Sequence, residues 1–348
     1  MVATFRSALT RSSLNSYHRR HSQEARAALQ GIEHDRGPTP PALLRRCNEY
    51  AADALGWSGY ARWLHVYCAV AGEFREGWIP DDYYGEVVVP KVKRAYAKLS
   101  HLKALSGPLF RSEVFPDLAY RTHGALISRS YHPIRWQDLE ELLFRTGERA
   151  VFKPDFSRQG RQIVFLTRAS FDPAAAMRLG NGVFQRHIEQ HPFFSALMPS
   201  SVATLRITTT IEDGTPTART SFLRLGRTAD THVRSQTHVR IPVDVRNGRL
   251  ATQGYLPTWH TIDRHPDTSV AFHDLKIPAY SECVSTALAL HRQVPFVQCV
   301  GWDLVVDRHG EVKVIEWNSD HNDIKFSEAT QGPCFRDLHW DTLWRAET

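Results

Sequence analysis

The spacing of apolar and polar positions divides the chain into a helical first part and a strand-rich remainder. Up to about residue 105, apolar and Ala-rich segments of helical length alternate with Pro- and Gly-containing breaks. From about residue 110 the apolar runs become short and are bounded by polar loops, which is typical of strands. Helices followed by strands mixed with helices indicate an α+β or α/β fold, and we expect α+β.

Individual elements follow from these runs. Helices are predicted over residues 22–29, 42–55, 61–72, 173–179 and 279–292. Strands are predicted over residues 149–153, 162–167, 183–188, 204–211 and 220–225. A last pair of strands flanks a turn at Asp307-Arg308-His309-Gly310. The sequence contains no repeat of 20–50 residues, so a solenoid or propeller is not expected.

The last predicted hairpin carries two acids and an amide. Strand alternation predicts that one face carries Val312, Val314, Glu316 and Asn318. A turn centred on residues 308–309 pairs Asp303 with Val314, so Glu316 becomes the diagonal neighbour of Asp303, roughly 7–8 Å away between Cα atoms. A one-residue bulge at Gly310 would change this register.

Acidic groups this close need a counter-charge. Two unpaired carboxylates about 6 Å apart repel by roughly 3 kcal/mol at an effective dielectric constant near 20. Mg²⁺ removes that repulsion and prefers oxygen ligands, so Asp303, Glu316 and Asn318 are a candidate magnesium site. The alternative is that these acids face solvent or pair with arginines.

Composition adds a basic bias to an ordinary globular chain. The 348 residues are 42% apolar and carry 43 Lys+Arg against 37 Asp+Glu, a net charge of +6. Because the arginines are scattered and no run of five like charges occurs, a site for an anionic small molecule is favoured over a nucleic-acid surface. Only 8 of the basic residues are lysines, so a lysine beside a candidate site is informative.

Cysteine usage and hydropathy bear on the compartment. The five cysteines form no C-x-x-C pair and no metal-ligand spacing, as expected of reduced thiols. The Arg- and Ser-rich N-terminal segment lacks the apolar core of a secretory signal, and no apolar run approaches the 18 residues of a membrane span. We therefore expect a cytoplasmic protein without a membrane span.

Several motifs together resemble a known family. Gly-Trp-Asp303 followed by Glu316-x-Asn318 is similar to the ATP-grasp superfamily. Further motifs in the same order resemble the sugar-transfer associated ATP-grasp family, namely Gln190-His-Pro, Ser201-Val-Ala-Thr-Leu-Arg206, His265-Pro-Asp-Thr268 and Ile277-Pro. The resemblance covers roughly residues 85–330. It implies two α/β subdomains that clasp ATP, preceded by a mostly helical region.

The resemblance also implies a domain division. We expect a mostly helical region over residues 1–105. A lid and central subdomain with the phosphate loop and the adenine hinge would occupy residues 106–190. The C-terminal subdomain with the metal site would occupy residues 191–348.

Phosphate contacts follow from the resemblance. Lys153, in Phe-Lys-Pro, is similar to the ATP-grasp lysine that contacts the nucleotide phosphates. The loop after it keeps only Gly160 where the family is richer in glycine, and Arg158 and Arg161 add positive charge. For the second phosphate-contacting lysine of the superfamily we choose Lys103, with Lys98 as the alternative. An exposed lysine before a proline is the alternative for Lys153.

The strand over residues 183–188 resembles the hinge that pairs with adenine. Arg186 C=O and Ile188 N–H could supply its acceptor and donor, next to the Gln185 side chain. Glu189 could accept hydrogen bonds from the ribose hydroxyls. An ordinary buried strand is the alternative.

Two strand arginines, Arg206 and Arg224, are candidates for binding a phosphate or carboxylate, because the guanidinium fork matches both. The resemblance places Arg206 near the reacting centre; rim ion pairs are the alternative for both arginines. Where family members usually carry Asn and Gly-Gly, this chain has a different segment over residues 231–240, which we expect to shape the acceptor site. A zinc site is not favoured, because no tight pair exists among His232, His238, His260 and His265.

The resemblance implies a function. We expect a carboxylate–amine ligase that uses ATP and Mg²⁺, forms an acyl phosphate and releases ADP and phosphate. Lys153, Arg206 and Arg224 would be the catalytic residues. The partners would be a small-molecule acid and an amine, without nucleic acid, and homo-oligomer formation is left open. The alternatives are a phosphotransferase of the same fold and a non-catalytic module that binds nucleotide or an anionic polymer. Ser-hydrolase and P-loop signatures are absent.

Overall fold

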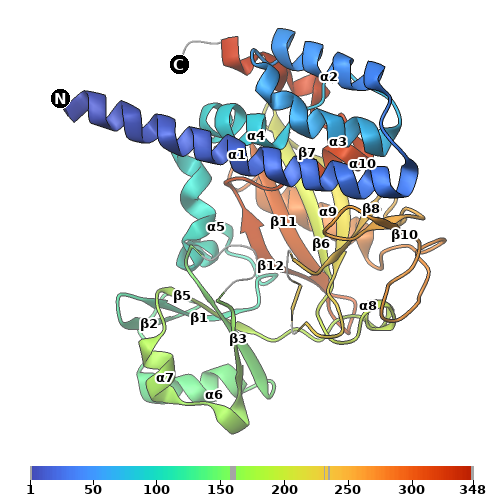
Figure 1. Cartoon of the computed structure of the whole chain (residues 1–348). Helices are drawn as coiled ribbons and strands as arrows, with labels where there is room; N and C mark the ends of the chain where they lie inside the picture. The colour runs from blue at the N-terminus through green and yellow to red at the C-terminus, as the bar shows by residue number, and fades with distance from the viewer. Residues whose placement is uncertain (1, 157–161, 231, 234–235, 346–348) are drawn as a thin grey trace.

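The chain folds into two antiparallel sheets and a helical N-terminal region (Figure 1). The computed structural model describes residues 2–156, 162–230, 232–233 and 236–345, with side chains from Ser12 onward. The expected α+β class is confirmed. Among the described residues, no helix combines the length and the apolarity that crossing a bilayer requires.

Helices make up the first 110 residues. They are α1 (Val2–Arg36), α2 (Pro41–Asp53), α3 (Ala61–Ala71), α4 (Asp81–Tyr83) and α5 (Ser106–Phe110), with irregular helical turns between α4 and α5. The predicted helix over 22–29 is too short, because α1 continues through Gly31. That glycine lets α1 lie against the chain at Thr258, whose carbonyl oxygen would be only 2.0 Å from a Cβ at residue 31.

The smaller sheet has the strand order β2-β1-β5-β3-β4. Its strands are β1 (Asp117–Thr122), β2 (Ala125–Ser128), β3 (Arg149–Pro154), β4 (Val164–Thr167) and β5 (Gly182–Arg186). Helices α6 (Leu139–Phe144) and α7 (Pro173–Arg178) lie below it in Figure 1. Leu143 and Phe144 pack with Phe152 and Phe184 into a small separate core.

The larger sheet has the order β10-β9-β8-β7-β6-β11-β12. Its strands are β6 (Thr204–Glu212), β7 (Thr215–Leu225), β8 (Val239–Val243), β9 (Gly254–Tyr255), β10 (Thr261–Ile262), β11 (Cys299–Val306) and β12 (Val312–Asn318). The remaining helices are α8 (Pro192–Leu197), α9 (Tyr280–His291) and α10 (Lys325–Gln331).

The two faces of the larger sheet belong to different cores. One face packs on α9 through residues such as Ile207, Trp302 and Leu304. The other contributes Phe222 and Tyr255 to a core shared with the N-terminal helices and α10. Figure 1 accordingly shows α1, α2 and α3 stacked over one end of this sheet. The smaller sheet lies inside the predicted 106–190 segment and the larger one inside 191–348, and the domain boundaries remain a prediction.

The register of the β11–β12 hairpin differs from the expected one. Asp303 lies opposite Glu316, and Leu304 lies opposite Val314. The predicted Asp303–Val314 pairing and the shared face of Val312, Val314, Glu316 and Asn318 are therefore wrong. The cause is a bulge at Ile315, whose extra residue reverses the alternation. Val314 stays in the α9 core, while Glu316 joins Asp303 on the opposite face.

Candidate active site

A row of charged side chains crosses the larger sheet where it meets the smaller one. Asp303 on β11 pairs directly with Arg206 on β6 and with Glu316 on β12. Cross-strand neighbours have Cβ atoms about 4.5–5.5 Å apart, so three neighbouring strands bring these groups together. The carboxylates predicted from the sequence are thus adjacent rather than diagonal.

Asp303 is held by two arginines. Arg206 binds it with both prongs of the fork, Nε to Oδ1 at 2.6 Å and Nη2 to Oδ2 at 3.1 Å. Arg224 Nη2 donates to the same Oδ1. Asp303 is 4% exposed and Arg206 5% exposed. Burial alone would raise the pKa of Asp303, but the two guanidinium groups outweigh it and hold the pKa well below its ordinary value.

Lysines stand on the other side of the row. Lys103 Nζ contacts Glu316 Oε1 at 2.5 Å. Lys153 Nζ donates to the carbonyl oxygen of Ile315, the bulged residue, at 2.9 Å. Burial lowers the pKa of Lys153. Burial alone would raise the pKa of Glu316, but Lys103 and Lys153 together outweigh it and lower the pKa. Both lysines chosen from the sequence therefore lie at the carboxylate row, and their role toward phosphate stays a prediction.

A small cavity of about 10 Å³ lies between the two sheets beside this row. Its lining includes Phe115, Asp117, Val183, Gln185 and Glu316. Gln185 Nε2 donates to Asp117 Oδ1 at 2.8 Å, and burial raises the pKa of Asp117. The cavity has room for about one water molecule, so an adenine ring would enter only if the two sheets move apart.

The predicted adenine hinge lies at the end of β5. Gln185 is buried and lines the cavity, whereas Arg186 is the last strand residue and its N–H donates to Pro116 O at 2.8 Å. Ile188 is buried just beyond the strand. Glu189 pairs with Arg308 at 2.6 Å. Their roles toward a nucleotide stay predictions. Gly160, Arg158 and Arg161, in the predicted phosphate loop, lie outside the described residues.

Sequence reasoning missed the network that holds the loop between β12 and α10. Arg206 Nη1 donates to Asn322 O at 2.9 Å, and Lys93 Nζ donates to Asp320 O at 2.6 Å and to Asn322 Oδ1 at 3.2 Å. Tyr84 OH also donates to Asn322 Oδ1. The N-terminal region therefore positions the loop that contacts Arg206. The one signal in the sequence was that Lys93 is among only eight lysines.

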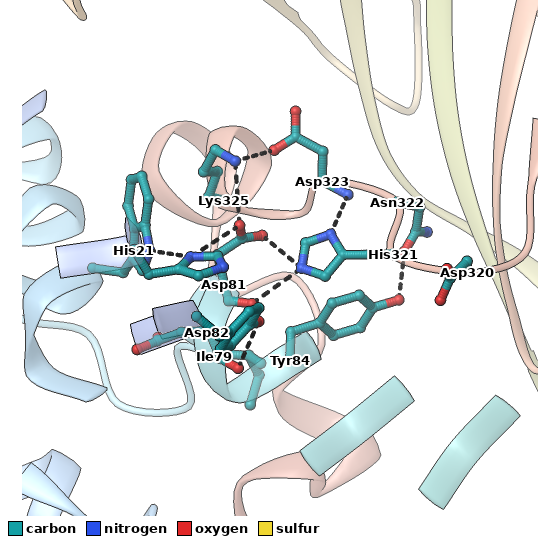
Figure 2. Close-up of polar contacts among 12 residues, drawn as sticks. His21, Ile79, Asp81, Asp82, Tyr84, Asp320, His321, Asn322, Asp323 and Lys325 are labelled. Atoms are coloured by element: carbon teal, nitrogen blue, oxygen red, sulfur yellow. Dashed lines mark hydrogen bonds and ion pairs between the residues drawn. The ribbon is translucent and has the colours of Figure 1, made fainter. Parts of the chain in front are cut away.

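Figure 2 shows the acidic centre of this network. Asp81, fully buried at the start of α4, lies 3.2 Å from Lys325 Nζ and 3.6 Å from His321 Nε2. His21 of α1 lies 3.8 Å from the same carboxylate. Three segments far apart in the sequence thus meet at one acid, and no local sequence pattern indicates this contact.

The four histidines weighed for zinc are spread over different segments. His265 is buried, with Nε2 against Gly226 O at 3.0 Å and Nδ1 accepting from Asp267 N–H. His260 pairs with Asp35 of α1 at 2.8 Å. Among the residues that the structure describes, no group of three His, Cys, Asp or Glu side chains could hold a metal ion.

The side chains of Asp303, Glu316 and Asn318 offer the type of ligand atoms that a hard cation prefers. It offers two carboxylates on adjacent strands and an amide group 3.4 Å from Asp303. Oxygen donors of this type suit Mg²⁺. In this structure the ammonium of Lys103 is the positive charge beside Glu316. A bound metal ion would replace that ammonium as the counter-charge of Glu316.

Comparison with known proteins finds a family match over part of the chain. Residues 173–339 match the family model described as sugar-transfer associated ATP-grasp. The resemblance to this ATP-grasp family is confirmed. The matched ATP-grasp segment contains the whole larger sheet, and with it Arg206, Asp303 and Glu316, whereas Lys153 precedes it. No curated protein matches the chain in sequence.

Solved ATP-grasp structures are similar at low identity. A biotin carboxylase β,γ-ATP complex from Campylobacter jejuni is 10% identical, with 72% of this chain and 47% of that chain covered and a TM-score of 0.45. The ATP-grasp ligase PsnB with its minimal precursor is 11% identical, with 83% and 70% covered and a TM-score of 0.41. D-alanyl-alanine synthetase A from Vibrio cholerae O1 biovar eltor is 10% identical, with 81% and 72% covered and a TM-score of 0.41. The chain spans about half the length of the biotin carboxylase.

Proposed function

We propose that the protein is an ATP-dependent ligase that joins a carboxylate to an amine. The family match over residues 173–339 supports this reading. The observation that carries it is the arrangement of Arg206, Asp303 and Glu316 on three neighbouring strands, facing the lysines beside the smaller sheet. Such a row of alternating charge can hold a nucleotide phosphate next to a substrate carboxylate.

Asp303, Glu316 and Asn318 would hold Mg²⁺. When bound, Mg²⁺ supplies charge neutralisation at the ATP phosphates. The protein's own contribution is to keep both acids ionised at neutral pH, since the cations around them lower the pKa of each. Lys103 and Lys153 would bind phosphate oxygens from the other side.

The arginines would orient the acid and balance its developing charge. A substrate carboxylate oxygen attacks the γ-phosphorus, the bond to the β-phosphate bridging oxygen breaks, and ADP leaves. Arg206 and Arg224 would neutralise the resulting acyl phosphate. The amine nitrogen then attacks the acyl carbon, phosphate leaves with the bonding electrons, and the amine proton is released. Catalysis is then positioning and charge stabilisation, without a nucleophilic side chain.

The adenine would lie between the sheets. Arg186 C=O and Ile188 N–H would pair with its edge next to Gln185, and Glu189 would turn from Arg308 to the ribose. The small cavity at Gln185 supports this position, because it already opens between β5 and β12. Gly160 and its loop would cover the phosphates.

Mass spectrometry tests the reaction type. Purified protein is incubated with Mg·ATP and a panel of acids and amines, and the products are identified by mass. A ligase sustains ADP release over many turnovers only when both an acid and an amine are present, and its product has the summed mass of the two less one water. A phosphorylated product that accumulates without the amine, and persists in its presence, would identify a phosphotransferase instead.

A further inference from the structure

Arg240 is a buried cation without an ion-pair partner among the residues that the structure describes. It lies on β8 directly opposite Arg224 on β7 and is 5% exposed. Its Nε has no hydrogen-bond partner, and its guanidinium forms no ion pair with a residue that the structure describes. This distinguishes it from Arg206 and Arg224, which both bind Asp303.

Aromatic rings hold the guanidinium in place. Its central carbon lies 4.7 Å from the centroid of Trp259 and 4.5 Å from that of Phe326. Cation–π contacts of this kind do not use the N–H hydrogen-bond donors of the guanidinium. Those N–H groups form the planar fork that binds a carboxylate or phosphate with two hydrogen bonds.

The surrounding charges compensate this cation only in part. Arg224 faces it across the strand pair and repels it. Asp323 attracts it but is already paired with Lys325 at 2.8 Å. Burial lowers the pKa of Arg240 to about 10, so it is charged at neutral pH. A buried, charged and unpaired arginine is costly to the fold, and an anionic ligand would remove that cost.

The position of Arg240 on the sheet indicates where such an anionic ligand would lie relative to Arg206. Arg206, Arg224 and Arg240 occupy three consecutive strands, β6, β7 and β8, on the face opposite α9. Strands are about 4.8 Å apart, so Arg240 lies about 10 Å across the sheet from Arg206, on the side away from Glu316 and its lysine. An acid that reacts at Arg206 could therefore extend toward Arg240.

We propose that Arg240, together with Arg224, binds a second anionic group of the acid substrate. This inference rests on the proposed function and narrows its substrate class to acids with two anionic ends. Arg240 is a binding residue here and takes no part in the bond-making steps. Arg240 is the last residue of the 231–240 segment that departs from the family pattern, and it lies on β8.

Anion binding without turnover tests the subsite. Thermal unfolding is followed with saturating Mg·ADP and increasing glutarate, a dicarboxylate, with valerate as the monocarboxylate of the same length and inorganic phosphate as a third probe. We expect glutarate to bind at least tenfold more tightly than valerate, about 1.4 kcal/mol. Phosphate binding as tight as that of glutarate would indicate a phosphorylated acid, and weaker binding a second carboxylate.

The variant Arg240→Met separates binding from folding. It should lower glutarate affinity to that of valerate, while its unfolding temperature stays equal to or above that of the wild type, because an unpaired buried charge is lost. Arg246→Met, 90% exposed on the turn after β8, is the matched control and should bind like the wild type. Equal binding of glutarate and valerate by the wild type, or unchanged glutarate affinity in Arg240→Met, overturns the proposal.

The two proposals fail differently. If only the subsite is wrong, acid- and amine-dependent ADP release persists in Arg240→Met with an unchanged KM for the acid. If only the ligase reaction is wrong, the difference between glutarate and valerate remains.

Discussion

Replacing Asp303 by Asn tests the electrostatics of the charged row. The change keeps the side-chain shape but removes the one negative charge that Arg206 and Arg224 share. Breaking a buried ion pair by removing one partner costs about 3–5 kcal/mol. With about 2.1 cal/mol/K of unfolding entropy per residue, or about 0.7 kcal/mol/K for the chain, the unfolding temperature should fall by about 4–7 °C.

Circular dichroism melts of Asp303→Asn measure this directly. Asp213→Asn, an exposed change in the β6–β7 turn, is the matched control and should melt within about 1 °C of the wild type. Adding Arg206→Gln to Asp303→Asn should restore part of the loss, because one uncompensated charge leaves with it. If Asp303→Asn melts together with the control, the arginines do not depend on Asp303 and the reasoning is refuted.

Two further predictions concern lysines. Mg·ATP should stabilise the wild type by about 2.7 kcal/mol at a hundredfold excess over Kd, and Lys153→Met should lose most of this stabilisation. The exposed control Lys276→Met should keep it. Equal ATP-induced shifts of the unfolding temperature in both variants would contradict the phosphate role of Lys153. Burial lowers the pKa of Lys93 from 10.5 to about 8, so between pH 8 and 10.5 the unfolded chain binds the proton that the folded chain has lost, and stability rises with pH. Lys93→Met should remove about 3 kcal/mol of this rise, seen as a flatter pH dependence of urea unfolding; an unchanged dependence would contradict the burial of a charged Lys93.

The carboxylate row shows what the sequence could and could not predict. The motif residues and the turn were enough to bring Asp303 and Glu316 onto neighbouring strands. The register was wrong because Val314-Ile315-Glu316 continues the strand pattern without a sign of the bulge. Only packing reveals it, since the bulge keeps Val314 in the core and turns the Ile315 carbonyl toward Lys153.

Long-range polar contacts escaped prediction for a different reason. Lys93 reaches Asn322, and Asp81 meets Lys325, across more than two hundred residues of sequence. Pattern and propensity describe only neighbours along the chain, so the part of the N-terminal region in holding the loop beside Arg206 was invisible. The environment of Arg240, which has no ion-pair partner within the described part of the chain, was missed likewise, because an arginine in a strand shows no sign of its partners.

The most direct test of the central claim is ADP release by Glu316→Gln. With Mg·ATP and the acid and amine identified by mass spectrometry, the account predicts a loss of at least about a hundredfold, as for removal of a key charge-stabilising group. Glu311→Gln, an exposed change on the same hairpin, should keep the wild-type rate and unfolding temperature. Glu316→Gln leaves Lys103 without its partner, so it should melt at a lower temperature but still in one cooperative transition. Full ADP release by Glu316→Gln would contradict the assignment of Asp303, Glu316 and Asn318 as the metal site of an ATP-dependent ligase.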